Sequence, residues 1–197
     1  MKKFIKLKLN KIKSSRKNYI LLFLIFNSAW IMSQNIDIVN PEKNIGINNW
    51  IIVNDNVMGG ISNSKLSLNK ENNLVFNGNV SLDNNGGFAS VRHSLKKGLL
   101  KGIKSFKILI KGDGNIYKLR FRQQNRRAAY SSDFKSKAGK WVELEIPVEN
   151  LIPSWRGYYY NDYPEINLEK VVSVGIQISD KQEGDFELEI KSIMGNY

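Results

Sequence analysis

The chain has 197 residues, no cysteine and a formal net charge of +12. A chain of this length is expected to form one domain with a substantial core. Without cysteine it has no disulfide, no thiol nucleophile and no thiolate metal site, so the packing of apolar side chains must stabilise the fold.

The positive charge is concentrated at the start of the chain. Residues 1–33 carry eight lysines and arginines and no aspartate or glutamate. Removing these eight charges from +12 leaves +4 for the remainder. A surface this weakly basic does not indicate a nucleic-acid partner, and recognition of any anion must depend on local clustering of basic residues.

The first 33 residues have the pattern of a secretory signal peptide. A basic segment precedes the apolar stretch Tyr19–Phe26, and small residues follow, among them Ala29 and Ser33. We expect cleavage after Ser33, with cleavage after Ala29 as the second choice. The segment Tyr19–Met32 has 14 residues, against roughly 20 for a membrane span, so an uncleaved anchor is the less favoured alternative. The mature chain is therefore predicted to be periplasmic or secreted, without a stable transmembrane segment.

Beyond residue 35 the dominant pattern is alternation of apolar and polar residues with period two. Six segments show it, with apolar positions at Leu74, Phe76, Val80 and Leu82; Phe106, Ile108 and Ile110; Tyr117, Leu119 and Phe121; Val142, Leu144, Ile146 and Val148; Val172, Val174, Ile176 and Ile178; and Phe186, Leu188 and Ile190. Each segment is typical of a strand with one buried face. No window past the leader has helical periodicity.

Turn sequences separate these segments. Asn84–Gly87 and Gly112–Asn115 supply the residues that tight hairpins need, and Asp180–Gly184 makes a longer turn. Many short strands with polar outer faces predict an all-β fold, a two-sheet sandwich formed by a single domain over residues 35–197. The remaining long stretch, Asn150–Asn167, contains Trp155 and four tyrosines, and we expect it to be an irregular loop with a functional role.

The inventory of residues does not favour catalysis. The single histidine, His93, shares its parity with Ala89 and Val91 and is predicted to be a structural, hydrogen-bonded residue near a sheet edge. Aspartates that could act in a hydrolase occur in or near turns, at Asp55, Asp113, Asp162 and Asp180. Turns favour aspartate for conformational reasons, so a hydrolase is kept only as an alternative. We expect a protein that is not an enzyme and that has no metal or cofactor.

The most concentrated basic feature past the leader is the row Lys118, Arg120 and Arg122, which Arg126 and Arg127 continue. One interpretation is an anion-binding strip on one face of a sheet. The favoured interpretation is a solvated outer face, with cross-strand partners such as Glu143 and Glu145.

Three short segments are candidates for recognition. Asp55–Ile61 contains Val57, Met58 and two glycines, which predict an abrupt turn where the backbone closely approaches another strand or a ligand. Gly86–Phe88 leaves the same two alternatives open. Trp155–Gly157 places an aromatic ring beside a guanidinium, a combination suited to stacking on a sugar or anchoring a protein partner.

The ordered set of these segments carries a family resemblance. It comprises Trp50–Gly60, Gly86–Arg92, Gly112–Tyr117, Tyr130 with Phe134, Trp141–Pro147, Arg156–Gly157, Val174–Asp180 and Gly184–Ile190. Over about residues 45–193 the chain resembles the complex I intermediate-associated protein 30 family. The resemblance implies a galactose-binding-like jelly roll and a non-enzymatic, chaperone-like role. Mitochondrial members assist assembly of the membrane arm of NADH:ubiquinone oxidoreductase, whereas this chain carries a predicted export signal.

Our leading hypothesis is a non-catalytic binding protein of the cell envelope that recognises a protein partner through loops or one sheet face. The alternative is a carbohydrate-binding module that recognises a glycan, with Trp155 or Tyr158–Tyr160 as stacking platforms. Arginines would donate paired hydrogen bonds, glycines would permit close approach, and Met58 would make an adaptable apolar contact. The predicted binding surface is Asp55, Met58, Gly59, Gly60, Gly87, Arg92, Arg120, Trp155 and Arg156.

Overall fold

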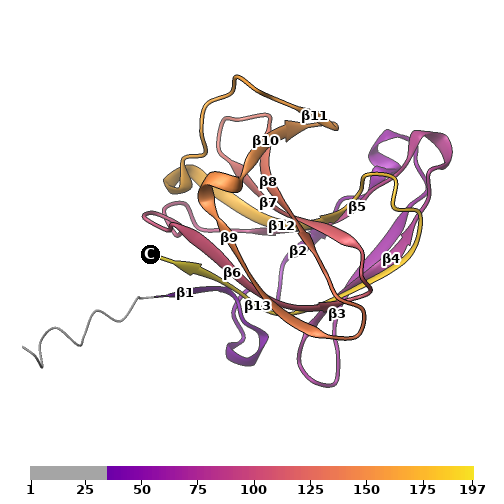
Figure 1. Ribbon diagram of the computed structural model, residues 1–197, viewed down its shortest axis with the longest axis horizontal. Helices are drawn as coiled ribbons and strands as arrows, with labels where there is room; N and C mark the ends of the chain where they lie inside the picture. Colours follow the sequence, from indigo (N-terminus) through magenta and orange to yellow (C-terminus); the bar gives the residue numbers. More distant parts are fainter. Residues whose placement is uncertain (1–34) are drawn as a thin grey trace, which may run out of the picture. The chain divides into compact units, whose positions relative to one another are not determined.

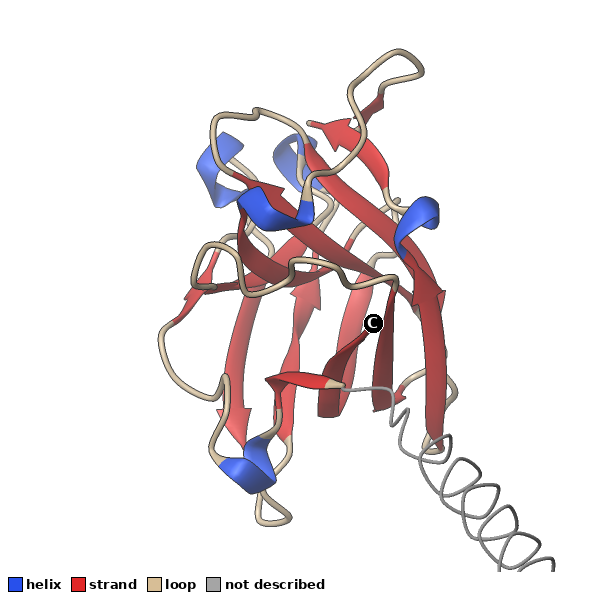
Figure 2. Ribbon diagram, turned by 90° about the vertical axis from the view of Figure 1, so that its left-hand side faces the viewer, coloured by secondary structure: helices blue, strands red, loops and turns tan. Residues whose placement is uncertain are grey.

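Two antiparallel sheets make up the part of the chain that the structure describes, residues 35–197 of a computed structural model. The predicted signal peptide, residues 1–33, lies outside the described residues. Strands form the body of the domain, and the short 3-10 helices lie in its connections (Figure 2). No helix in the described part is long and apolar enough to cross a bilayer.

The first sheet has the order β3-β4-β13-β6-β9, and β1 pairs with β13 beside it (Figure 1). Its strands are β1 (Ile36–Val39), β3 (Asn63–Leu68), β4 (Leu74–Val80), β6 (Ser105–Gly112), β9 (Trp141–Pro147) and β13 (Gly184–Asn196). The long strand β13 is the centre of this sheet, because its first half pairs with β4 and its second half with β1.

The second sheet has the order β11-β10-β8-β7-β12-β5-β2. Its strands are β2 (Trp50–Ile52), β5 (Ala89–Ser94), β7 (Ile116–Gln123), β8 (Ala129–Lys135), β10 (Ile152–Trp155), β11 (Tyr158–Tyr159) and β12 (Val171–Ile178). The helical turns of the domain are η2 (Pro41–Lys43), η3 (Asp55–Met58), η4 (Asp83–Asn85), η5 (Val148–Asn150) and η6 (Leu168–Lys170).

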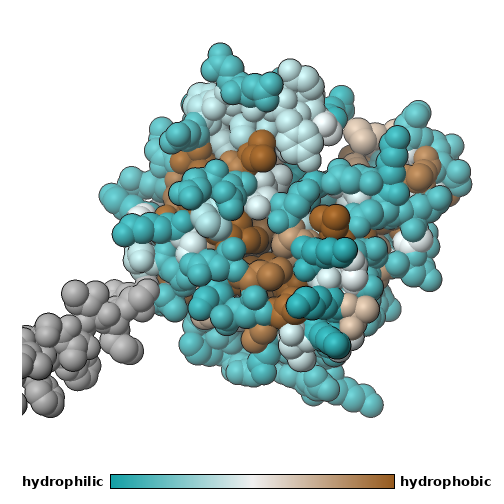
Figure 3. Space-filling model, viewed as in Figure 1, coloured by the Kyte–Doolittle hydropathy of each residue, from teal (hydrophilic) through white to brown (hydrophobic). Residues whose placement is uncertain are grey.

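The core lies between the inner faces of the two sheets. Phe106 on β6 and Phe121 on β7 are fully buried, and their rings stack with centroids 4.3 Å apart. The inward positions of β13, Leu188 and Ile190, are also fully buried. The outward positions are polar, and the face shown in Figure 3 is mostly hydrophilic with separate hydrophobic patches. The prediction of an all-β jelly-roll sandwich, galactose-binding-like, is confirmed.

The predictions for the strands are wrong at two strand ends and at the start of β12. Leu82 follows the end of β4, and Val148 begins η5 instead of continuing β9. On β12 the pairing with β7 shifts register between Val171 and Ser173. This irregularity buries Val171 and leaves Val172 only partly buried, although the alternation predicted the reverse.

The histidine lies where the alternation predicts it. His93 on β5 pairs with Trp50 on the edge strand β2, and the two rings are 5.3 Å apart. Burial lowers the pKa of His93, and a hydrogen bond with the backbone of Asn48 opposes this shift. The residue is therefore part of the packing between β5 and the sheet edge.

Candidate functional site

On the outer face of the second sheet, one row of paired residues crosses six strands and contains two arginines. In register, the row runs Ile152, Ser131, Arg120, Gly175, Arg92 and Ile51. The next row on one side contains Asp133, Lys118, Gln177 and Ser90, and the next on the other side contains Ala129, Arg122, Ser173 and Ser94. Long basic side chains thus alternate with small residues, which leaves space above the sheet between them.

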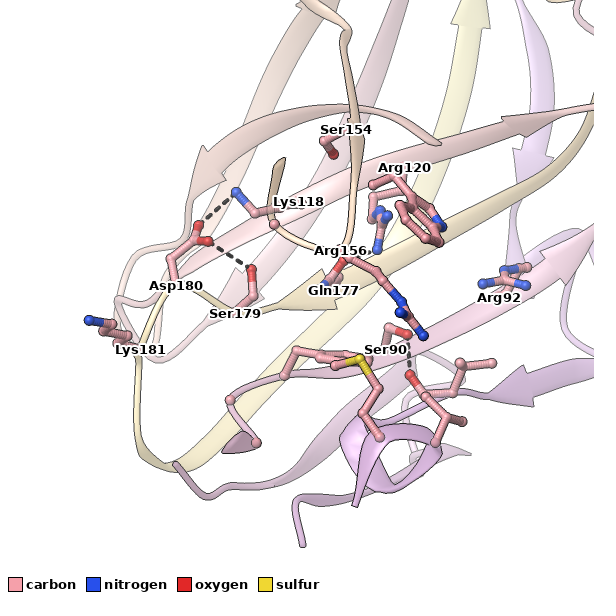
Figure 4. A pocket seen from close by; sticks show the side chains of 18 of the residues that line it. Ser90, Arg92, Lys118, Arg120, Ser154, Arg156, Gln177, Ser179, Asp180 and Lys181 are labelled. Atoms are coloured by element: carbon pink, nitrogen blue, oxygen red, sulfur yellow. Dashed lines mark hydrogen bonds and ion pairs between the residues drawn. The ribbon is translucent and has the colours of Figure 1, made fainter. Parts of the chain in front are cut away.

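A pocket of about 420 Å³ occupies this face. The sheet forms its floor, and the β10–β11 hairpin, the η3 segment, the Gly86–Phe88 segment and the turn at Asp180 form its walls. Figure 4 shows Arg92, Arg120 and Lys118 on the strands and Arg156 reaching in from the hairpin. Basic residues at the pocket are Arg92, Lys118, Arg120, Arg122, Arg156 and Lys181, and the acidic residue is Asp180.

The wall above the floor is a hairpin where we expected an irregular loop. Trp155 pairs with Tyr158, so Arg156 and Gly157 are its two turn residues, with φ of 50° and 79°. Two successive positive φ angles are characteristic of the type I′ turn that matches strand twist. The guanidiniums of Arg127 and Arg156 each lie 4.9 Å from the centre of the Trp155 ring. Trp155 therefore holds cations at the pocket instead of presenting a free ring.

Lys118 is the most buried basic residue of the pocket, with 6% of its surface exposed. Its ammonium lies 2.7 Å from Asp133 and 2.7 Å from Asp180, and it donates a hydrogen bond to the hydroxyl of Tyr159 at 3.1 Å. Burial alone would lower the pKa of Lys118, but these hydrogen bonds outweigh it and raise the pKa. Lys118 is thus fully paired, and the group that it forms with its two aspartates keeps one net negative charge.

The predicted partners of the basic row were wrong. Glu143 and Glu145 lie on β9, which belongs to the first sheet. Glu143 pairs there with Lys107 at 3.3 Å, and Glu145 accepts a hydrogen bond from Ser105. The face is also not a plain outer surface, because the hairpin and the η3 segment border it and form a pocket there.

Three half-buried arginines, Arg92, Arg120 and Arg122, form what we call the arginine cluster. Among residues 35–197 no carboxylate lies within ion-pairing distance of their guanidiniums. Arg120 donates a hydrogen bond to the neutral side chain of Gln177. Burial, together with repulsion from Arg122 and Arg92, lowers the pKa of Arg120 to about 10. The cluster is thus a concentration of positive charge that the fold itself does not neutralise.

Asp55 is buried, so its predicted place on a binding surface is wrong. Its carboxylate accepts hydrogen bonds from the backbone of Ser62 at 3.0 Å, Gly87 at 2.7 Å and Phe88 at 3.3 Å, and from the Ser62 hydroxyl. Burial would raise the pKa of Asp55, but these hydrogen bonds lower it below its ordinary value. Asp55 therefore holds together two walls of the pocket, the η3 segment and the Gly86–Phe88 segment.

The two predicted glycines of the η3 segment belong to this support. Gly59 ends η3, and a Cβ on Gly60 would lie 2.4 Å from the Asp55 carboxyl carbon. The close approach predicted for this segment is thus to the side chain of Asp55. The other predicted residues all line the pocket: Met58, Gly87, Arg92, Arg120, Trp155 and Arg156.

Sequence reasoning missed Gln177 and Ser179, which line the pocket. Tyr159 and Asp180 also line it, although they were named only for the glycan and hydrolase alternatives. The parity of β12 was a usable signal for Gln177, because Ile176 and Ile178 were predicted to face the core. Nothing in the sequence places Tyr159 beside Lys118, since that contact depends on the hairpin folding back over β7.

Residues 36–190 match the family model described as Complex I intermediate-associated protein 30. The chain belongs to this family. It is 25% identical over 169 residues to the mitochondrial complex I intermediate-associated protein 30 of Mus musculus. That alignment covers 75% of this chain and 52% of the mouse protein, so the chain spans about half the length of that relative.

The family member shares its fold with solved carbohydrate-binding modules. The family 11 module of the Clostridium thermocellum cellulase Lic26A-Cel5E matches with a TM-score of 0.61 at 15% identity, over 83% of this chain and 93% of the module. A family 29 module matches with a TM-score of 0.54 at 10% identity, over 84% of this chain and 87% of the module. Identities this low establish a common fold and no more.

Proposed function

We propose that this family member is a non-catalytic, assembly-factor-like protein that holds a protein partner with the pocket face of its second sheet. The observation that carries the proposal is the arginine cluster. It has no carboxylate partner within residues 35–197, and it lies in a pocket with a sheet floor and walls formed by four segments. Positive charge left unpaired within a fold is suited to an acidic surface on another molecule. The name of the mouse relative, which refers to complex I intermediates, supports a role in assembly.

Exposed apolar side chains beside the cluster support a protein partner. Ile51 pairs with Arg92 across β2 and β5 and is 57% exposed, while Val57 and Met58 at the pocket are 66% and 45% exposed. Arginine and methionine are enriched at protein interfaces, where apolar contact and charge recognition occur together. We also propose a location in the cell envelope, and its support is the predicted signal peptide alone.

Carbohydrate binding is the second candidate. A family 11 module of the same fold is described in complex with a β-1,3-1,4-mixed-linked tetrasaccharide, with a TM-score of 0.56. Tyr158 is 65% exposed and packs edge-on against Tyr160 at 5.0 Å, which offers an aromatic surface at the rim. Against this candidate, the Trp155 ring is already in contact with two guanidiniums, whereas neutral sugars stack on uncovered aromatic faces.

The test compares the unaltered full chain with two matched double variants. Each protein carries an affinity tag and is expressed in the native host cell. Met58→Ala/Arg156→Ala removes one apolar and one basic side chain from the pocket. Lys65→Ala/Leu68→Ala removes the same two types from β3, on the first sheet, where both are exposed. Co-purified proteins are quantified after cross-linking.

The proposal expects a partner that the unaltered chain and the β3 variant retain and the pocket variant loses. Equal recovery by all three proteins would overturn it. The glycan candidate is tested in parallel by tryptophan fluorescence with a mixed-linked glucan tetrasaccharide. A pocket-dependent change in fluorescence, with no pocket-dependent protein partner, would replace the proposal with the second candidate.

A further inference from the structure

A small notch opens in the sheet beneath the arginine cluster. Its volume is about 20 Å³, and it adjoins the floor of the pocket. The residues around it include Ser90, Arg92, Arg120, Arg122, Ser173 and Gly175. A space of this size accommodates about one water molecule or one ligand oxygen. Long basic side chains thus surround a hollow of atomic dimensions, and the hydroxyl of Ser90 beside it donates to the carbonyl of Val53.

The register of the sheet explains the notch. Gly175 on β12 lies directly opposite Arg120 on one side and Arg92 on the other, and Ser173 lies opposite Arg122. The notch forms because Gly175 and Ser173 have little or no side chain to fill the space between the three arginines. A Cβ on Gly175 would lie 2.6 Å from the carbonyl oxygen of Val91, so a larger residue there would require a backbone shift.

The charges around the notch are not balanced within the described domain. The nearby aspartates, Asp133 and Asp180, are both paired with Lys118 at 2.7 Å. Burial and the charge of Arg122 lower the pKa of Arg92, and the pKa of Arg120 falls to about 10 for the same kinds of reason. Holding three guanidiniums together opposes folding, and an anion between them would remove that cost.

We propose that the notch is an oxyanion subsite that takes the carboxylate of an aspartate or glutamate side chain from an acidic segment of the partner. This inference rests on the proposed protein-binding function and specifies which group of the partner is recognised. One carboxylate oxygen occupies the notch above Gly175, and guanidiniums from β5 and β7 donate to it from two sides.

The surroundings of the notch favour a peptide as the source of this carboxylate. Val57 and Met58 line the same pocket and can contact an apolar residue adjacent to the acidic one. Arg156 and Lys181 lie on the turns at the rim and contribute attraction at longer range. Gln177 holds Arg120 by a hydrogen bond, which orients the guanidinium before the ligand arrives.

The test measures binding of a blocked tetraglutamate peptide to the full chain by calorimetry at low ionic strength, with the tetraglutamine peptide as its neutral match. Arg92→Gln/Arg122→Gln removes two charges from the notch. Arg156→Gln/Lys181→Gln removes two charges from the rim and leaves the notch intact. Circular dichroism checks that each variant retains its β-sheet spectrum, and inorganic sulfate serves as a second oxyanion probe.

We expect the notch variant to lose affinity for tetraglutamate by about tenfold or more, the rim variant to lose about threefold or less, and tetraglutamine not to bind. Equal losses in the two variants would mean long-range attraction only and would overturn the subsite. Sulfate binding at the notch without tetraglutamate binding would overturn the carboxylate assignment.

The two proposals fail separately. If the notch variant still captures a partner that Met58→Ala/Arg156→Ala loses, the subsite is wrong and the proposed function stands. If no pocket variant affects capture, the proposed function is wrong whatever the peptide measurements give.

Discussion

Asp55→Asn is expected to destabilise the domain by about 3–6 kcal/mol. The amide of asparagine can still accept from the backbone N–H of Ser62, but its NH₂ group then faces the N–H groups of Gly87 and Phe88, which now donate to the carboxylate at 2.7 and 3.3 Å. Each hydrogen bond to a charged group contributes about 1.5–3 kcal/mol, and two are lost. For a domain of this size the melting temperature should fall by roughly 10 °C.

The pH dependence of this effect has a definite sign. Because hydrogen bonds hold the folded-state pKa of Asp55 below the ordinary value of 3.8, its carboxylate stabilises the fold above about pH 3.8. That contribution disappears as the pH falls through the folded-state pKa. The difference in unfolding free energy between the unaltered protein and Asp55→Asn should therefore be largest at neutral pH and should shrink below about pH 3.8.

Urea unfolding followed by tryptophan fluorescence at pH 7 and at pH 3 measures both quantities. The matched control is Asp83→Asn, since Asp83 is an exposed residue of η4. The control should lose little stability at either pH. The reasoning would be refuted if Asp55→Asn cost no more than the control, or if its cost were the same at both pH values.

Three further variants test the core, the support and the floor of the pocket. Phe121→Ala should lower the unfolding free energy by about 3–5 kcal/mol in urea titrations, because the ring is fully buried and stacks on Phe106; a cost below about 1 kcal/mol would contradict this packing. Gly60→Ala should lower the melting temperature by several degrees, because its methyl group would overlap the fixed side chain of Asp55; an unchanged melting temperature would show that the segment can yield. Lys118→Met should lower the unfolding free energy by only about 1 kcal/mol at pH 7, because the two aspartate partners of Lys118 are more than half exposed and water can solvate them. Since the pKa of Lys118 is raised in the folded state, this difference in stability should disappear only as the pH rises above about 10.5. A difference that vanished near neutral pH would be inconsistent with the ion pairs.

The central strands of the fold could be predicted because each carries its own periodic signal. β7 alternates strictly from Tyr117 to Arg122, and β6 alternates from Phe106 to Lys111 except at Leu109; the apolar parity of each is buried in the structure. The short edge strands had no such signal. β2 has three residues, two of them exposed isoleucines, and β11 has two exposed tyrosines. Their pairing is determined by neighbours on the sheet and not by their own patterns.

The site could be predicted only in part, because its contacts join distant segments. Parity placed Arg120 on an outer face, but the strand order determines that its neighbours are Gln177 and Arg92 and not the glutamates of β9. Asp55 was assigned to the binding surface as part of the segment Asp55–Ile61. It is buried because its hydrogen-bond donors at Gly87 and Phe88 come from a segment more than 30 residues further along the chain.

The alternation of side chains on β7 and β12 has a practical consequence. Along each strand, alternate side chains point into the core and the others line the pocket or the notch. Residues such as Arg122, Ser173 and Gln177 can therefore be varied without changing a core side chain. A randomised library confined to these positions should yield mostly folded proteins with altered selectivity. The domain could thus serve as a cysteine-free scaffold for engineered binders.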